Sequence, residues 1–144
     1  MSAENVELIK AILPEESDLV EVLASDDPVG VFVGDASMVA RDLEVEFAGT
    51  QSGAPALHYR GLEGLLEGWR DRLIPWDSYR IRFEEFFDAG ENVVVFATVH
   101  ARTGRHGVAV EHRPAAVWTI RDGKTVAVCF FLERDEALKF AGIE

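Results

Sequence analysis

The chain has 144 residues, 48% of them hydrophobic, and a formal net charge of −12 at pH 7. This length is typical of one domain, so we expect residues 1–144 to form a single domain with its own core. The acidic balance excludes a nucleic-acid partner, because phosphate binding needs a basic surface, and it also disfavours anionic membranes. With no apolar run near the roughly 18 residues of a membrane span, and no visible signal peptide, we expect a cytoplasmic protein.

The rare residue types carry little chemistry of their own. Cys129 is the one cysteine and lies between Val128 and Phe130 in a predicted strand, which favours a small core residue over a nucleophile. The cations are 11 Arg and 3 Lys, a bias typical of a GC-rich bacterial genome. The histidines show no metal-ligand spacing and no phosphate loop is present, so we expect no cofactor.

The first third of the chain predicts helices. Apolar residues recur at helical spacing over residues 3–13, and Pro14 ends that helix. Glu15 begins the first turn of a second predicted helix, where negative charge suits the helix dipole. Asp27 followed by proline is a favourable start, so residues 28–39 are predicted as a third short helix.

A strand, a loop and a long helix follow. Apolar and acidic residues alternate over residues 43–47, which predicts a half-buried strand, and residues 49–55 read as a loop. From Gly61 to about Pro75 the apolar spacing becomes helical. Gly64 and Gly68 are four residues apart, so one side of this helix is expected to approach the sheet closely.

The second half of the chain predicts antiparallel strands. Alternation over residues 79–83 slips at 84–87, which indicates a β-bulge. Residues 92–132 contain three β-branched and aromatic runs, separated by a turn at 103–107 and by Asp122-Gly123, a strong hairpin signal.

The chain ends in a predicted short helix, capped by Asp135 and closed by Gly142. Helices, one strand, a helix and then four antiparallel strands predict an α+β layer architecture with the helices on one face of the sheet. Strands of this length coil, so the sheet is expected to be curved and to leave a pocket against the helices.

Several local strings occur in an order and spacing that resemble the SnoaL-like branch of the nuclear transport factor 2-like superfamily. They are residues 4–8, 59–61, 87–90, 117–124, 136–138 and 141–142. The resemblance implies a cone-shaped sheet wrapped around the N-terminal helices and a central helix, enclosing a deep apolar cavity. It also implies a homodimer formed through the outer sheet face. It does not imply one reaction, because ketosteroid isomerases, polyketide cyclases, dehydratases and non-catalytic members share this fold.

The register that the resemblance implies places alternate residues of the last three long strands on the cavity wall. These are Val94, Phe96, Thr98 and His100, then Val110, His112, Pro114, Ala116 and Trp118, and finally Val128, Phe130 and Leu132. If the hairpin turns near Gly104, His112 lies opposite Thr98 and His100 lies one diagonal step away.

His100 and His112 are therefore the predicted catalytic residues. A neutral imidazole in an apolar cavity is a base that can remove a proton next to a carbonyl group, while the second imidazole or Thr98 donates to the enolate oxygen. The other interpretation is that both are strand histidines satisfied by neighbours. The predicted ligand-binding residues are Phe47, Tyr59, Trp69, Phe96, Thr98, Trp118 and Phe130.

Two functions follow from the sequence. The first is binding of a small hydrophobic molecule, with proton transfer of the isomerase, cyclase or dehydratase type. The alternative is a non-catalytic ligand-binding or dimeric interaction module. An open cavity with both imidazoles on its wall would favour the enzyme, whereas close packing of Phe47, Trp69, Trp118 and Phe130 would favour the module.

Overall fold

The computed structural model describes residues 2–13, 15–26, 36–48, 55–103 and 107–142, and it confirms the predicted α+β class. The helices are α1 (Ser2–Ile12), α2 (Leu19–Ala24), α4 (Gly61–Arg72), α5 (Arg134–Ala141) and the 3-10 turn η1 (Ala36–Met38). The strands are β1 (Glu16–Asp18), β2 (Val39–Phe47), β3 (Leu57–Arg60), β4 (Ser78–Ala89), β5 (Asn92–Arg102), β6 (Ala109–His112), β7 (Ala115–Arg121) and β8 (Lys124–Phe131).

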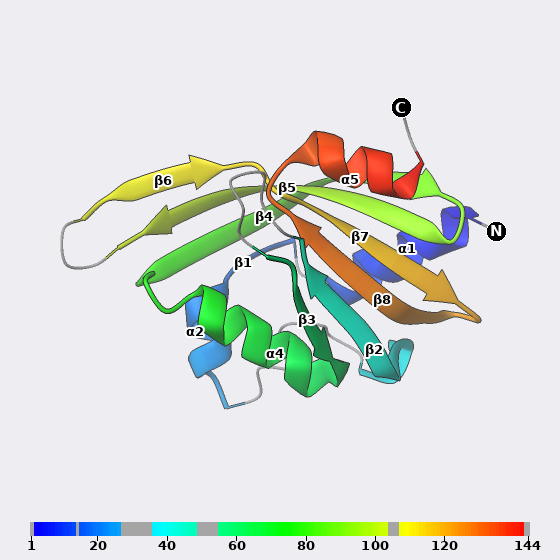
Figure 1. Cartoon of the computed structure of the whole chain (residues 1–144), viewed down its shortest axis with the longest axis horizontal. Helices are drawn as coiled ribbons and strands as arrows, with labels where there is room; N and C mark the ends of the chain where they lie inside the picture. The colour runs from blue at the N-terminus through cyan, green and yellow to red at the C-terminus, as the bar shows by residue number, and fades with distance from the viewer. Residues whose placement is uncertain (1, 14, 27–35, 49–54, 104–106, 143–144) are drawn as a thin grey trace.

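The described strands form one curved sheet (Figure 1). Its order is β1-β4-β5-β7-β8-β2-β3, and β6 pairs with the far end of β5. Neighbours are antiparallel except β2 and β8, which run parallel. The run predicted as one strand after residue 107 is interrupted at Arg113 and Pro114, where proline cannot donate a ladder hydrogen bond, and so it forms β6 and β7.

Helices pack on both faces of the sheet. The larger core joins the inner face to α1, α2 and α4 through buried residues such as Ile9, Val22 and Trp69. The smaller core joins the outer face to α5 through Ala137 (Figure 1). The expectation that all helices cover one face is therefore wrong for α5. Val94 and Phe96 on β5 give the sheet a second apolar face, and α5 covers it.

The segment after α1 differs from the predicted helix that starts at Glu15. Glu16–Asp18 is extended and pairs with β4 as β1, and Asp18 caps the short helix α2 by accepting a hydrogen bond from the backbone N–H of Val20 at 3.0 Å. The third predicted helix lies mostly outside the described residues. In its described part, Ala36–Met38 forms the 3-10 turn η1, and β2 begins at Val39, where the predicted helix was expected to end.

The close approach predicted for the glycines of α4 is confirmed. A Cβ atom added to Gly68 would lie 2.5 Å from Cε1 of Phe47 on β2, and one added to Gly64 would lie 3.0 Å from Cβ of Tyr59. Tyr59 belongs to β3, an edge strand that was not predicted from the sequence. Glycine thus lets α4 lie directly against β2 and β3.

The predicted bulge and hairpin turn in the second half of the chain are both present. The β4–β5 pairing shifts register between Phe83 and Glu85, which is the predicted bulge. Asp122 and Gly123 have φ angles of 53° and 75° and join β7 to β8 in a two-residue hairpin. The N-cap of α5 is Glu133 rather than the predicted Asp135, and Gly142 closes the helix with φ 81°.

Candidate functional site: an apolar pocket with a polar corner

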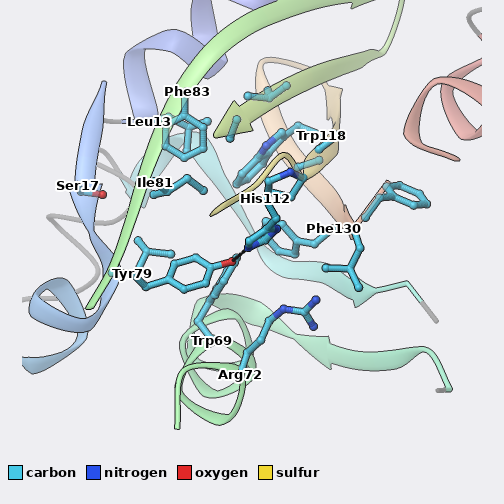
Figure 2. A pocket seen from close by; sticks show the side chains of 18 residues that line it. Leu13, Ser17, Trp69, Arg72, Tyr79, Ile81, Phe83, His112, Trp118 and Phe130 are labelled. Carbon is cyan, nitrogen blue, oxygen red and sulfur yellow. Dashed lines mark hydrogen bonds between the residues drawn. The ribbon is translucent and has the colours of Figure 1, made fainter. Parts of the chain in front are cut away.

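A pocket lies between the inner face of the sheet and the helices (Figure 2), with a volume of about 50 Å³. This volume is enough for a few water molecules. Its polar or aromatic lining residues are Ser17, Trp69, Arg72, Tyr79, Phe83, His112, Trp118, Phe130 and Phe131. The other lining residues are Leu13, Leu19, Ile81, Val95, Ala97, Pro114, Ala115, Ala116 and Leu132. Leu132 is exposed and Arg72, His112 and Pro114 are half-buried, so the pocket opens on their side.

Tyr79 and His112 form a hydrogen-bonded pair at this opening. The Tyr79 hydroxyl group lies 3.2 Å from Nε2 of His112 (Figure 2). Burial raises the pKa of Tyr79 to about 12, so the phenol stays protonated at neutral pH. Burial, followed by the charge of Arg72, lowers the pKa of His112, which favours the neutral imidazole. The pair therefore offers a neutral base beside a protonated phenol.

Arg72 brings a positive charge to the same corner. It is the last residue of α4 and its side chain rises beside Trp69 toward the pair formed by Tyr79 and His112 (Figure 2). Its guanidinium carbon lies 4.9 Å from the centroid of the Phe47 ring, a cation–π contact. Burial lowers the pKa of Arg72, but a guanidinium stays charged in proteins.

Away from the opening, the wall carries two buried polar atoms that have no hydrogen-bond partner among the residues that the structure describes. These are Nε1 of Trp118 and Oγ of Ser17. Trp118 is 2% exposed, and an indole N–H can only donate. Because a buried donor is normally satisfied, the Trp118 N–H is suited to a water molecule or to an acceptor atom of a ligand.

The position of Tyr79 depends on Asp18. Besides capping α2, the Asp18 carboxylate accepts hydrogen bonds from the backbone N–H of Tyr79 at 3.1 Å and from the Ser78 hydroxyl at 3.0 Å. One carboxylate thus fixes the starts of α2 and β4 together. This arrangement places the Tyr79 side chain at the pocket.

Several predicted ligand-binding residues pack against one another. The Phe47 ring lies 4.9 Å from Phe130, 5.4 Å from Trp69 and 5.8 Å from Tyr59 between centroids. The Phe130 ring also contacts Trp118 at 6.2 Å. Trp69, Trp118 and Phe130 line the pocket, whereas Phe47 and Tyr59 lie behind this layer and support it.

The cavity-facing positions predicted for β5 are wrong. His100 is on the outer face, its side chain is 66% exposed, and Nε2 lies 3.6 Å from Glu111. Thr98 donates a hydrogen bond to Glu84 at 2.6 Å, which is the largest cause lowering the pKa of that carboxyl group. Phe96 packs on Phe87 in the outer core. The residues of β5 that line the pocket are Val95 and Ala97.

A register slip of one residue explains this error. His112 pairs with Val99 rather than Thr98, and a shift of one moves every side chain to the other face. Residues 93–99 are all buried because helices cover both faces of β5, so alternation gives no signal there. On β6, β7 and β8 the predicted residues His112, Pro114, Ala116, Trp118, Phe130 and Leu132 do line the pocket.

Sequence reasoning missed Arg72 and Tyr79 as members of the site. Arg72 follows Trp69 by three residues, and that spacing puts both on one helix face. Tyr79 alternates with Ile81 and Phe83 on β4, and all three line the pocket. Both patterns are present in the sequence. However, an arginine on a helix is usually a surface residue, and an alternating tyrosine on a strand is usually a core residue, so neither pattern indicated a site.

Other reactive groups do not form a site. Burial raises the pKa of the Cys129 thiol to about 12, so the reactive thiolate is disfavoured. Among the described residues, no group of three or more His, Cys, Asp or Glu side chains is placed to hold a metal ion. Within those same residues no helix is both long and apolar enough to cross a membrane.

A curved sheet with helices enclosing an apolar pocket defines the fold class of the nuclear transport factor 2-like proteins. Residues 16–128 match the model of the SnoaL-like domain family. The chain belongs to this family, which confirms the resemblance inferred from the sequence. No curated protein matches the chain.

Solved structures share the fold at low sequence identity. A putative SnoaL-like polyketide cyclase from Jannaschia sp. CCS1 is 16% identical, with a TM-score of 0.66 over 96% of this chain and 91% of its own. TerC, co-crystallised with polyporic acid, is 20% identical, with a TM-score of 0.62 over 96% and 98%. A hypothetical protein with a ketosteroid isomerase-like fold from Catenulispora acidiphila, in complex with trimethylamine, is 13% identical, with a TM-score of 0.58 over 96% of this chain and 94% of its own.

Proposed function

We propose that the chain binds a small, largely apolar molecule in the pocket and that His112 acts there as a general base toward a carbonyl compound. The observation that supports this proposal is the pairing of His112 with Tyr79 at 3.2 Å on the wall of a pocket lined mainly by apolar side chains. TerC and the protein from Catenulispora acidiphila, which share the fold, also hold small molecules.

In the proposed mechanism, Nε2–H of His112 donates to the Tyr79 oxygen, which leaves Nδ1 as the acceptor. Nδ1 removes a proton from the carbon next to the ligand's carbonyl group, and the Tyr79 oxygen stabilises the imidazolium that forms. The buried N–H of Trp118 donates to the carbonyl oxygen, where the enolate charge develops. Return of the proton to another carbon would give an isomerisation.

One observation favours the alternative of a non-catalytic module. Trp69, Phe130 and Phe47 are in mutual ring contact, and the remaining volume of about 50 Å³ is below the roughly 300–1,000 Å³ of drug-sized ligand sites. Only one imidazole is on the wall in the described structure. A ligand larger than a few waters would have to extend out of the pocket through the opening beside the half-buried Arg72 and the exposed Leu132.

Exchange of the α-protons of cyclohexanone in D2O, followed by proton NMR, tests the catalytic proposal. We expect the protein to accelerate exchange over buffer and His112→Gln to lower the protein-dependent rate by about 100-fold, the usual contribution of a general base. His100→Gln is the matched control, because that ring is exposed on the outer face.

The outcomes separate the two functions. If His100→Gln retains the rate while His112→Gln loses it, the base is assigned. If the wild-type protein binds cyclohexanone, as seen by shifts of its indole N–H signals, but exchange is no faster than in buffer, the chain is a binding module and the catalytic proposal fails.

A further inference from the structure

Arg72 stands out among the pocket residues because its charge has no counter-ion in the part of the chain that the structure describes. Among the described residues it makes no ion pair and no hydrogen bond, and the groups that raise its pKa are the phenols of Tyr79 and Tyr59 rather than carboxylates. By contrast, the guanidinium of Arg134, which is also half-buried, lies 3.6 Å from a carboxylate oxygen of Glu84.

The surroundings of Arg72 hold the guanidinium without neutralising it. Its contact with the Phe47 ring involves the π face of the phenylalanine, which accepts no lone-pair hydrogen bond. The guanidinium has five N–H donors in a fork that matches a carboxylate. Because the chain carries a net charge of −12, a half-buried cation with no carboxylate partner among the described residues is an unusual arrangement.

We propose that Arg72 is the anion receptor of the pocket and that the ligand is a small hydrophobic molecule with a carboxylate group. This inference rests on the proposed binding function and adds the substrate class. The carboxylate lies at the opening, against Arg72, and the hydrocarbon part extends into the pocket along the wall formed by Trp69, Trp118 and Phe130. A neutral apolar ligand would cover the guanidinium without pairing it, at a cost in desolvation.

Benzoate and benzamide are the matched probes, since they share one ring and differ in the charged group. Binding is followed through the indole N–H signals of Trp69 and Trp118, which line the pocket. We expect the wild-type protein to bind benzoate at least tenfold more tightly than benzamide, because charge-assisted hydrogen bonds to a guanidinium are strong. Arg72→Gln should lower the affinity for benzoate at least tenfold relative to that for benzamide and so abolish this preference.

Arg70→Gln is the matched control. Arg70 is an exposed residue of the same helix, so its removal changes the net charge equally without touching the pocket. This variant should retain the tenfold preference. Arg72→Lys should keep part of it, because lysine supplies the charge without the planar fork.

Each outcome is decisive. Equal binding of the two probes by the wild-type protein, or an equal loss of preference in Arg70→Gln, would overturn the anion receptor while leaving pocket binding intact. Failure of the wild-type protein to bind either probe would overturn the proposed binding function itself. Retained benzamide binding in Arg72→Gln shows that this variant is folded, so a lost preference then supports the inference.

Discussion

The imidazole of His112 is held between a phenol and a guanidinium, and this position determines its titration. Burial and the charge of Arg72 both lower its pKa from the ordinary 6.5. We expect the His112 ring protons, assigned by their absence in His112→Gln, to titrate with a midpoint below pH 6.5 in an NMR series. A midpoint at or above that value would contradict the described environment.

The same shift links His112 to stability. Below pH 6.5 the unfolded chain binds a proton at this residue before the folded chain does. The contribution of neutral His112 to the free energy of unfolding is therefore complete above pH 6.5, and it is lost as the pH falls through the pKa of His112 in the folded state. Acidification consequently weakens the fold and removes the base of the proposed reaction over the same pH range.

At the scale of elements, the contact between α4 and β2 depends on Gly68. Alanine is the better helix former by roughly 1 kcal/mol, yet its Cβ would lie 2.5 Å from Phe47. Overpacking of this kind costs about 1–3 kcal/mol, so we expect Gly68→Ala to lower the free energy of unfolding by about 1 kcal/mol. Urea denaturation followed by circular dichroism measures this change.

Glu67→Ala is the control for that substitution. Glu67 is exposed on the same helix, so its replacement should change stability by less than about 0.5 kcal/mol. A Gly68→Ala protein more stable than the wild type would show that α4 can move away from Phe47. The supporting layer behind the pocket would then be looser than described.

At the scale of the whole molecule, we propose a homodimer formed through the outer sheet face. Phe140 on α5 is 57% exposed and borders a shallow groove that includes Val117, Thr119 and Ala127 of that face. Light scattering after size exclusion should give a dimer for the wild type and a monomer for Phe140→Glu. Ile74→Glu changes a residue that is 78% exposed just after α4 and should remain dimeric. A monomeric wild type would refute the proposal.

Much of this architecture could be predicted from the sequence, because local chemistry determines it. Asp122-Gly123 specified its hairpin, and the broken alternation near Glu85 specified the bulge. The sequence does not show which side chains of β5 face the pocket, since residues 93–97 are all apolar and only tertiary packing distinguishes the two faces. The role proposed for Arg72 depends on its having no carboxylate partner among the described residues. Local sequence patterns do not predict this, because ion-pair partners can be distant in the sequence.

The parallel pairing of β2 with β8 has a consequence for how the chain reaches this shape. Val45 pairs with Val128, so β2 can pair with β3 early but meets β8, its other neighbour, only after β8 has been synthesised. Until β8 is made, the edge of β2 that pairs with β8 is unpaired and can pair with strands of other chains. Long sequence separation between partners slows folding, so in the cell this family member is expected to depend on chaperone protection during synthesis.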